Sequence, residues 1–323
     1  MKLVQNLYDR EKIEKTPTRN GYGEALIDLA KINPNTVALC ADLTGSTRTD
    51  YFQKAAPERF IECGIAEQNM IGLATGLALA GKVPFISTYA VFCPGRNWDQ
   101  LRISVCYNKA NVKLTGAHAG VSVGEDGATH QALEDIAITR CLPNITVIVP
   151  CDSVETKKAT LAAAEINGPV YLRFAREATP VFTTEETPFQ VGKAKVFREG
   201  NDISVIACGP LVYEALIAAE ELSKEGISVE VVNNHTIKPI DEKTIIESAK
   251  KTGAVVTAEE HQVMGGAGSA VCEVLAKNCP VPVEMVGVLD RFGESGKPDE
   301  LMKEFKLTSD NIKEAIKKVL TRK

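Results

Sequence analysis

The chain contains 323 residues, which is long enough for two domains that each bury a core. Hydrophobic residues make up 44% and charged residues 24% of the composition, as in ordinary soluble globular proteins. The formal net charge of -5 gives no reason to expect nucleic acid or an anionic membrane surface as a partner.

The N-terminus has no apolar signal core, and no uninterrupted apolar run approaches the length of a membrane span. We therefore expect a cytoplasmic protein. The nine cysteines include no Cys-x2-Cys or Cys-x4-Cys pair, so no metal site is predicted. Because several of them lie inside apolar segments, we expect small buried thiols in a reducing compartment.

The first half of the chain begins with polar residues 1–17, which we expect to be peripheral. Short apolar runs that predict buried strands then alternate with segments that predict helices. The expected helices are 22–30, 67–80, 98–107, 134–139 and 153–165, and the expected strands are 37–41, 60–61, 83–88, 112–115, 146–149 and 169–174. This alternation predicts a doubly wound α/β domain, in which ligands gather at the carboxyl ends of the strands.

A carboxylate at the start of one expected helix is the first candidate for function. Glu67 lies in the first turn of a Gly- and Ala-rich helix in which Met70, Leu73 and Leu77 recur at helical spacing, so most of the helix circumference is expected to be packed. Glu67 should therefore lie near the interior or an interface. The alternative interpretation is that its carboxylate only complements the helix dipole.

The Gly-rich loop 116–130 is the second candidate. It contains His118, Asp126 and His130, and the whole chain has only four histidines. A loop of this length without periodicity is more often functional than connective. Its glycines could equally serve only to form tight turns.

The second half resumes the alternation after residues 178–189, which are rich in Thr, Glu and Pro and are interpreted as an interdomain linker. The expected strands are 203–208, 228–233, 254–258 and 283–288, and the expected helices are 212–225, 242–250 and 267–277. We therefore expect two α/β domains, at residues 1–185 and 190–323. Gly265–Gly268 precedes a helix but lacks the Lys-Ser/Thr of a phosphate loop, so we expect close packing there.

Four motifs, in this order, resemble the second half of a transketolase. They are Gly64-Ile-Ala-Glu-Gln-Asn-Met70, Ser87-Thr-Tyr-Ala-Val-Phe92, Ser122-Val-Gly-Glu-Asp-Gly-Ala-Thr-His-Gln131 and Leu289-Asp-Arg-Phe-Gly-Glu-Ser295. The resemblance implies a pyrimidine-binding domain of a thiamine diphosphate enzyme followed by a transketolase C-terminal domain. The implied activity is transfer of a two-carbon ketol unit from a ketose phosphate to an aldose phosphate, as in the pentose phosphate pathway.

The diphosphate-binding domain of that family has no counterpart in the chain. In the family it carries Gly-Asp-Gly and a later Asn, which hold Mg²⁺ and the diphosphate, whereas Gly124-Glu-Asp-Gly127 is a different motif. The resemblance therefore implies that a separate N-terminal subunit supplies this domain and holds most of the thiamine diphosphate and Mg²⁺. Because each cofactor then lies between two subunits, we expect an α2β2 assembly.

The resemblance also implies roles for single residues. Glu67 matches the glutamate that hydrogen-bonds the aminopyrimidine of the cofactor, which makes it catalytic and places it in a dry, uncharged neighbourhood. Phe92 matches the aromatic residue that stacks on the pyrimidine, and Tyr89 and Asp42 are further expected cofactor contacts. The matching substrate contacts are Arg19, Ser46, His118 and Arg176 for the sugar phosphate, and Asp126 and His130 for the donor hydroxyls, with His130 also expected to be catalytic.

Three other interpretations stay open. Deoxyxylulose-phosphate synthases carry similar Gly-Ile-Ala-Glu-Gln and Gly-Glu-Asp-Gly-Ala-Thr-His segments, but they are usually longer single chains. The β-subunit of a 2-oxo acid dehydrogenase has the same domain pair and length, but it usually lacks the His-bearing segment. The third is a non-catalytic subunit that kept the fold, and the retention of Glu67, Phe92 and the loop residues argues against it.

Overall fold

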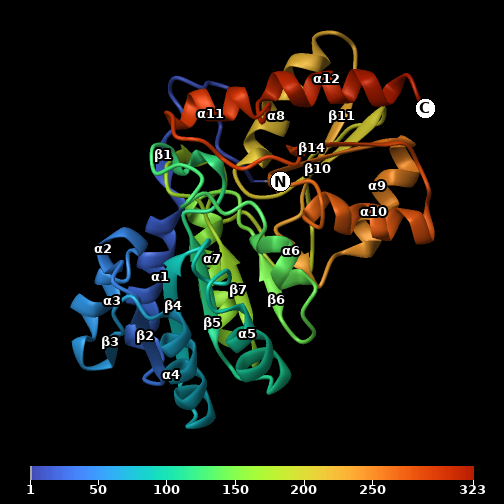
Figure 1. The fold of residues 1–323 in the computed structure, drawn as a ribbon. Helices are drawn as coiled ribbons and strands as arrows, with labels where there is room; N and C mark the ends of the chain where they lie inside the picture. The colour runs from blue at the N-terminus through green and yellow to red at the C-terminus, as the bar shows by residue number, and fades with distance from the viewer. Residues whose placement is uncertain (1) are drawn as a thin grey trace.

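The first sheet has seven strands in the order β12-β6-β7-β5-β4-β2-β3; six come from the first half of the chain, and β12 comes from the second half (Figure 1). The computed structural model describes residues 2–323. The strands of this sheet are β2 (Thr36–Cys40), β3 (Phe60–Glu62), β4 (Val83–Tyr89), β5 (Lys113–Ala117), β6 (Thr146–Ile148), β7 (Val170–Arg173) and β12 (Thr236–Lys238). Neighbouring strands are parallel except for β12 with β6. The predicted α/β fold class is confirmed.

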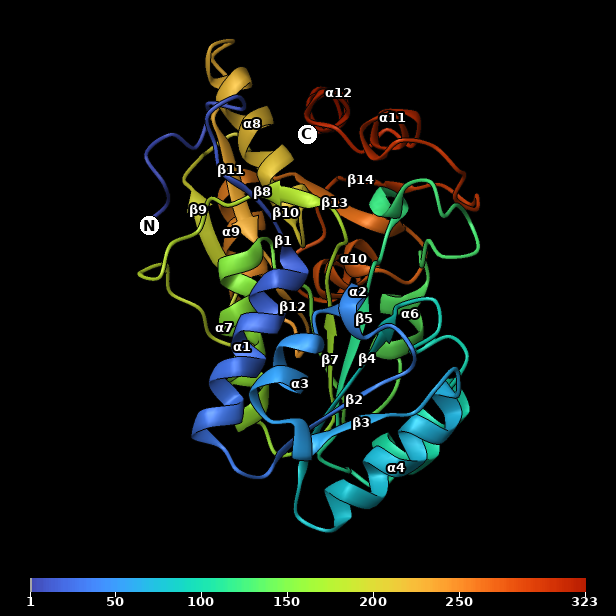
Figure 2. The ribbon, with the colours of Figure 1, turned by 90° about the vertical axis from the view of Figure 1, so that its left-hand side faces the viewer.

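Helices cover both faces of this sheet, as Figure 2 shows. They are α1 (Thr18–Ile32) and α7 (Ser153–Glu165) on one face, and α4 (Glu67–Leu79), the π-helix η2 (Leu101–Tyr107) and α6 (Asp135–Arg140) on the other. Successive strand residues point to opposite faces. Phe85 therefore packs in the core cluster of Tyr22, whereas the next residue, Ile86, packs in the cluster of Met70. Burial on both faces explains why these strands are continuous apolar runs in the sequence.

The second half forms a five-stranded sheet with the order β14-β13-β10-β11-β9, in which β9 is antiparallel to β11. Its elements are β9 (Lys195–Arg198), β10 (Ile203–Ala207), α8 (Leu211–Ser223), β11 (Val229–Asn233), α9 (Glu242–Thr252), β13 (Val255–Gln262), α10 (Ala267–Asn278), β14 (Val283–Val288), α11 (Pro298–Glu304) and α12 (Ser309–Leu320). One face packs on α8 and α12, and the other packs on α9 and α10. Val205 and Ile206 belong to these two different clusters, so this sheet is also buried on both sides.

The N-terminal segment is not peripheral, so that prediction was wrong. We call the seven-stranded sheet with its helices the first unit and the five-stranded sheet with its helices the second unit. Leu7 and Ile13 are buried in the core cluster of the second unit. Both terminal nitrogens of the Arg10 guanidinium donate to the Glu214 carboxylate, at 3.1 and 2.9 Å. The segment is mostly polar, but two apolar side chains and one ion pair are enough to anchor it to distant residues.

The expected linker is also held in place. β8 (Ala178–Pro180) pairs antiparallel with β1 (Lys15–Pro17). The buried Asp152 carboxylate accepts hydrogen bonds from Phe182 N at 2.9 Å and from Thr183 N at 2.7 Å. In addition, β12 comes from the second half of the chain and extends the first sheet. The first two contacts fix the linker to β1 and to the start of α7, and the pairing of β12 with β6 joins the two halves of the chain.

Several elements form that were not predicted from the sequence. They are β1, α2 (Thr44–Thr47), α3 (Asp50–Ala55), η1 (Pro57–Arg59), η3 (Val121–Val123), β8, β9, β12, α11 and α12. The expected helix 98–107 forms as α5 (Trp98–Gln100) followed by the π-helix η2. β13 continues to Gln262 because its polar end is buried and bonds to the first unit, for example from Gln262 N to Leu133 O at 2.9 Å.

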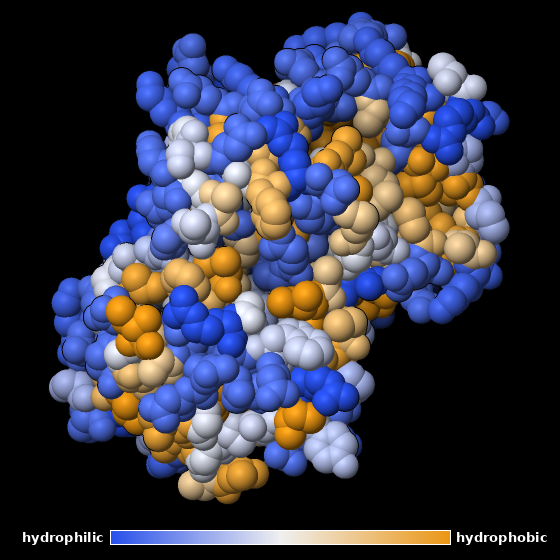
Figure 3. All heavy atoms as spheres, in the orientation of Figure 1, coloured by the Kyte–Doolittle hydropathy of each residue, from blue (hydrophilic) through white to orange (hydrophobic). Residues whose placement is uncertain are grey.

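One face of α4 is open in this chain. Met70 is fully buried, but Leu73 is 42% exposed and Leu79 is 71% exposed. Gly72 and Gly76 have open space where a side chain would lie. The expectation that most of this helix is packed is therefore wrong for the chain by itself. Figure 3 shows apolar surface at the lower end of the molecule, where α4 lies in Figure 1. Across residues 2–323, none of the helices is both long and apolar enough to cross a membrane.

Candidate active site

Most of the predicted site residues follow the carboxyl ends of neighbouring strands. Adjacent parallel strands β2, β4 and β5 end at Cys40, Tyr89 and Ala117, so the loops that follow them meet at one edge of the sheet. His118 follows β5 directly, and Arg176 follows β7. The topology therefore gathers residues that lie far apart in the sequence.

His118 and Arg19 form the centre of the phosphate-side group. Arg19 Nη1 donates to Ser46 O at 3.0 Å and lies 3.2 Å from His118 Nε2. Because a guanidinium can only donate, Nε2 must accept and the ring proton must be on Nδ1. That Nδ1 atom is buried and has no hydrogen-bond partner among residues 2–323. Burial and the positive charge of Arg19 lower the pKa of His118 to about 3, so the ring is neutral at physiological pH.

A His118→Asn variant is expected to lose less stability in acid than the parent chain. The folded protein leaves His118 unprotonated down to about pH 3, whereas the unfolded chain binds a proton near pH 6.5. The unfolded state binds more protons between these values, so the His118 contribution to the free energy of unfolding falls by about 1.4 kcal/mol for each pH unit below 6.5. Urea unfolding of both proteins at several pH values measures this difference. If the difference in the free energy of unfolding between the two proteins did not change with pH, His118 would not be a neutral buried residue.

A stack of aromatic rings links the phosphate side to the predicted cofactor side. The rings of Tyr89 and His118 stack with centroids 4.0 Å apart, and those of Tyr89 and Phe92 lie nearly parallel at 6.0 Å. The rings of His130 and Phe92 are nearly perpendicular, with centroids 5.5 Å apart. Tyr89 therefore places its ring against His118 as well as near Phe92, which the sequence did not predict.

Three guanidinium groups gather near His118. Arg48 Nε donates to Oδ1 of Asn20, the residue next to Arg19, at 2.9 Å. Burial, together with the positive charges of Arg48 and Arg176, lowers the pKa of Arg19. Arg176 Nη1 donates to Val123 O at 2.7 Å and lies 3.4 Å from the Asp126 carboxylate. Such a cluster favours an anionic ligand, because each guanidinium group can donate two parallel hydrogen bonds to the oxygens of a phosphate. Arg48 was not predicted, although it lies two residues after Ser46 in the same loop.

Glu67 begins α4 and is 2% exposed, so its prediction as a buried carboxyl is confirmed. Its neighbourhood is not uncharged, however. Arg96 Nη1 donates to Glu67 Oε2 at 2.8 Å, and the Arg96 guanidinium lies 4.5 Å from the centroid of the Phe92 ring. Arg96 thus contacts both residues that the resemblance assigns to the pyrimidine. No local pattern predicts this contact, because Arg96 is 29 positions away from Glu67.

Asp42 lies at the same edge but outside this set of contacts. It follows β2 in a left-handed backbone conformation, and its N–H donates to Glu62 Oε1 at 2.7 Å. Glu62 also accepts from Thr44 Oγ1 at 2.7 Å and from Gly64 N at 3.0 Å, so it organises two loops. Within residues 2–323, no hydrogen bond or ion pair joins the Asp42 side chain to the other predicted residues.

The start of α10 confirms the expectation of close packing at Gly265–Gly268. The Glu259 carboxylate accepts from Ala267 N at 2.7 Å and from Gly268 N at 2.8 Å. A Cβ at Gly266 would lie 2.2 Å from Glu259 Oε2. The anion-binding end of this helix is thus occupied by a carboxylate of the protein itself.

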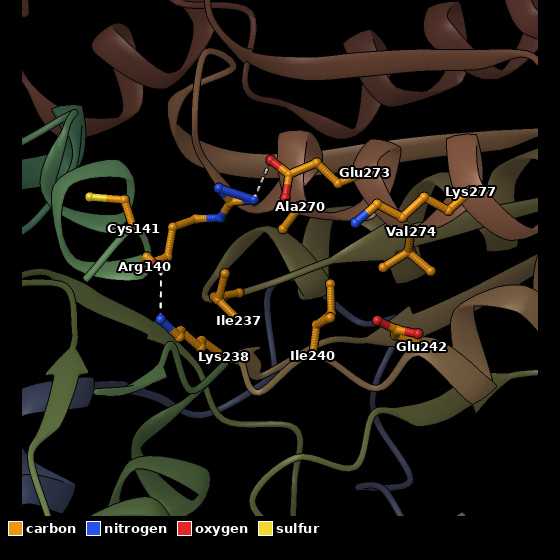
Figure 4. Close-up of a pocket in the computed structure, with 10 residues that line it drawn as sticks. All are labelled: Arg140, Cys141, Ile237, Lys238, Ile240, Glu242, Ala270, Glu273, Val274 and Lys277. Carbon is orange, nitrogen blue, oxygen red and sulfur yellow. Dashed lines mark hydrogen bonds and ion pairs between the residues drawn. The ribbon is translucent and has the colours of Figure 1, made fainter. Parts of the chain in front are cut away.

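A cavity of about 340 Å³ lies between α6, β12 and α10 (Figure 4). Two of its charged groups pair, because Arg140 Nη2 lies 2.7 Å from the Glu273 carboxylate, and Lys238 Nζ donates to the backbone carbonyl of Arg140 at 3.0 Å. The residues that line it are Arg140, Cys141, Ile237, Lys238, Ile240, Glu242, Ala270, Glu273, Val274 and Lys277. None of these is a predicted site residue, so this cavity is separate from the candidate site.

Two family models match consecutive parts of the chain. Residues 14–181 match the pyrimidine-binding domain of transketolase, and residues 192–312 match the transketolase C-terminal domain. A Methanocaldococcus jannaschii protein described as a putative transketolase C-terminal section is 48% identical over 92% of this chain and 94% of its own length. A Clostridium sp. (strain MSTE9) protein described as a 6-deoxy-6-sulfo-D-fructose transketolase subunit is 44% identical over 97% of each chain.

A solved structure is also similar to this chain over nearly its full length. It is described as a split-gene transketolase in an inactive β4 tetramer, and it matches with a TM-score of 0.89 and 48% identity over 94% of this chain and 98% of that chain. The chain covers only 50% of human transketolase, to which it is 41% identical. The two matched domains and the near-complete coverage of these section-length relatives show that the chain belongs to the transketolase family.

Proposed function

We propose that this chain is the catalytic C-terminal subunit of a two-chain transketolase that moves a two-carbon ketol unit from a ketose phosphate to an aldose phosphate. The observation that carries the proposal is a single connected site. A buried carboxyl beside an aromatic face is linked through the ring stack to a cluster of guanidinium groups. Such a site offers one end to a heteroaromatic cofactor and the other to a phosphate.

The residues present fit the pyrimidine of thiamine diphosphate. A ring of this kind needs a carboxyl that shares a proton with a ring nitrogen and an aromatic surface for stacking, and Glu67 and Phe92 offer both. When bound, this cofactor supplies the carbon nucleophile that accepts the ketol unit. Glu67 would hold the proton at the ring nitrogen once the Arg96 guanidinium no longer bonds to the Glu67 carboxylate. We propose that Mg²⁺ and the diphosphate are held mainly by the partner subunit.

The remaining residues would bind the sugar phosphate. Arg19 and Arg176 would pair with its phosphate oxygens, and the Ser46 loop is already bonded to Arg19. The Nδ1–H of His118 is a donor that has no acceptor within the described part of the chain, so it can donate to an anion without a change of protonation. Asp126 and His130 would contact the donor hydroxyls, and His130 would exchange protons with them.

We expect this chain to be inactive alone and active only when mixed with a chain that carries the Gly-Asp-Gly motif. The assay measures ketol transfer from xylulose 5-phosphate to ribose 5-phosphate with thiamine diphosphate and Mg²⁺. A second donor, 6-deoxy-6-sulfofructose, tests whether the guanidinium cluster accepts a sulfonate, as the name of the Clostridium relative suggests. Activity of the chain alone would contradict the split architecture.

A mixture in which the partner binds but no ketol is transferred would contradict the reaction. Synthesis of deoxyxylulose phosphate, or decarboxylation of a 2-oxo acid with acyl transfer to lipoamide, would then identify the competing families. The absence of every activity in a well-formed complex would favour a non-catalytic subunit.

We propose an α2β2 assembly in which the open face of α4 lies against other subunits. Leu73 and Leu79 are exposed on that helix, and exposed apolar groups of this kind mark interaction surfaces. The related structure described as an inactive β4 tetramer supports self-association of isolated subunits. Light scattering of the active mixture should give a mass of two copies of each chain. A stable, active one-to-one heterodimer would contradict the α2β2 assembly.

A further inference from the structure

The loop that carries Asp126 and His130 is held by a carboxylate of the second unit. Glu260, near the end of β13, is 2% exposed, and its Oε1 accepts a hydrogen bond from Ser122 N at 2.6 Å. Gly120 has a φ of +91°, and a Cβ there would lie 2.3 Å from the Glu260 carboxylate. The loop therefore approaches Glu260 more closely than any side chain at position 120 would allow.

A buried amide ties the same loop to the second unit at another point. Gln131 is 3% exposed, and its Nε2 lies 3.1 Å from both Val121 O and Gly124 O. The same nitrogen lies 2.9 Å from Glu294 O, which belongs to the second unit. In addition, the turn η3 packs against α11. The backbone immediately before Asp126 is thus bonded on two sides.

Glu260 is itself fixed by the framework of the first unit. Arg173 Nη2 donates to Glu260 O at 2.7 Å. Arg173 ends β7 and is held by a buried ion pair with Asp135, at 2.8 Å. The carboxylate that receives the Ser122 N–H therefore sits at the end of a continuous set of bonds that begins in the first sheet. A supporting group of this kind can hold a loop without touching a ligand.

We propose that Glu260 is a positioning residue for the donor site, which acts through Ser122 N to hold Asp126 and His130 in place against the hydroxyls of the ketose. The identity of the ligand in this inference rests on the proposed function, whereas the hydrogen bond between Ser122 N and Glu260 does not. The second unit thereby shapes a site whose side chains all belong to the first. A misplacement of about 1 Å in a reacting site can reduce the rate by about 10²-fold, so the bond has a measurable consequence.

The test compares three variants in the active mixture with the partner subunit. Glu260→Ala removes the acceptor and should raise the KM for the donor ketose, with kcat/KM for the donor reduced roughly ten- to hundredfold. Glu260→Gln keeps a side-chain oxygen and should restore most of the donor kcat/KM. Glu259→Ala is the matched control, because Glu259 is the preceding residue and is equally buried but bonds to α10 instead of the loop. It should lower stability and leave the donor KM unchanged.

A second readout does not depend on catalysis. Amide hydrogen exchange of the isolated chain should become faster across residues 118–131 in Glu260→Ala, but not in Glu259→Ala or Glu260→Gln. A donor KM that is equal in all three variants and the parent, or unchanged exchange in the loop, would overturn the positioning role. An inactive parent mixture would instead contradict the proposed function, and the exchange experiment would still decide whether Glu260 holds the loop.

Discussion

Glu67→Gln in the assembled enzyme is expected to lower kcat by about 10²–10⁴-fold, the range that general acid–base catalysis contributes. Gln has the same length and fits the same buried position at the start of α4. Its amide cannot take up or release a proton, so it cannot share one with a ring nitrogen of the cofactor. The variant therefore separates the proposed proton transfer from simple packing.

Two measurements accompany this prediction. Titration calorimetry and light scattering should show that the variant still binds the partner, which would assign the lost activity to chemistry. Glu58→Gln is the matched control, because its carboxylate is 70% exposed and pairs with Arg59 at the surface. It should leave kcat unchanged. Near-full activity of the Glu67→Gln enzyme would mean that Glu67 has no catalytic role.

Asp135→Asn is expected to lower the free energy of unfolding by about 3–5 kcal/mol, because it leaves the charge of Arg173 buried and uncompensated. The two side chains are 1% and 4% exposed, and Arg173 Nε lies 2.8 Å from Asp135 Oδ2. Tyr171 donates a further hydrogen bond to the same oxygen at 2.8 Å. Urea unfolding monitored by circular dichroism measures the loss.

A double variant tests the physical reason for this loss. Asp135→Leu combined with Arg173→Met removes both charges, so it should be less destabilised than either single variant. Glu247→Gln provides a surface control, because the Lys243–Glu247 pair is 79% and 66% exposed. It should change stability by no more than about 0.5 kcal/mol. A similarly small effect of Asp135→Asn would show that the buried pair is not required.

The repeating elements of both units were predictable because their signals are local. α7 and β14 have the expected bounds, since apolar spacing defines them and Asp152 caps α7 with a hydrogen bond from Glu155 N at 2.9 Å. Short elements and elements with distant partners were missed, and so was α12, although its buried residues Ile312, Ile316 and Val319 recur at helical spacing. The short strand β12 exists because β6 offers it an edge, and Leu7 and Ile13 are buried because the second unit offers them a core.

For the candidate site, the sequence by itself determined the family motifs, the carboxyl at position 67 and the Gly-rich loop, whereas the order of the strands whose ends meet comes from the structure. Only the tertiary structure decided which side chains touch. Arg96 on Glu67, Arg48 beside Arg19 and Glu260 under the donor loop all depend on contacts between residues far apart in the chain or on the direction of a flexible side chain. Such contacts have no local period, because they are set by the packing of two sheets and not by the spacing of residues along one element.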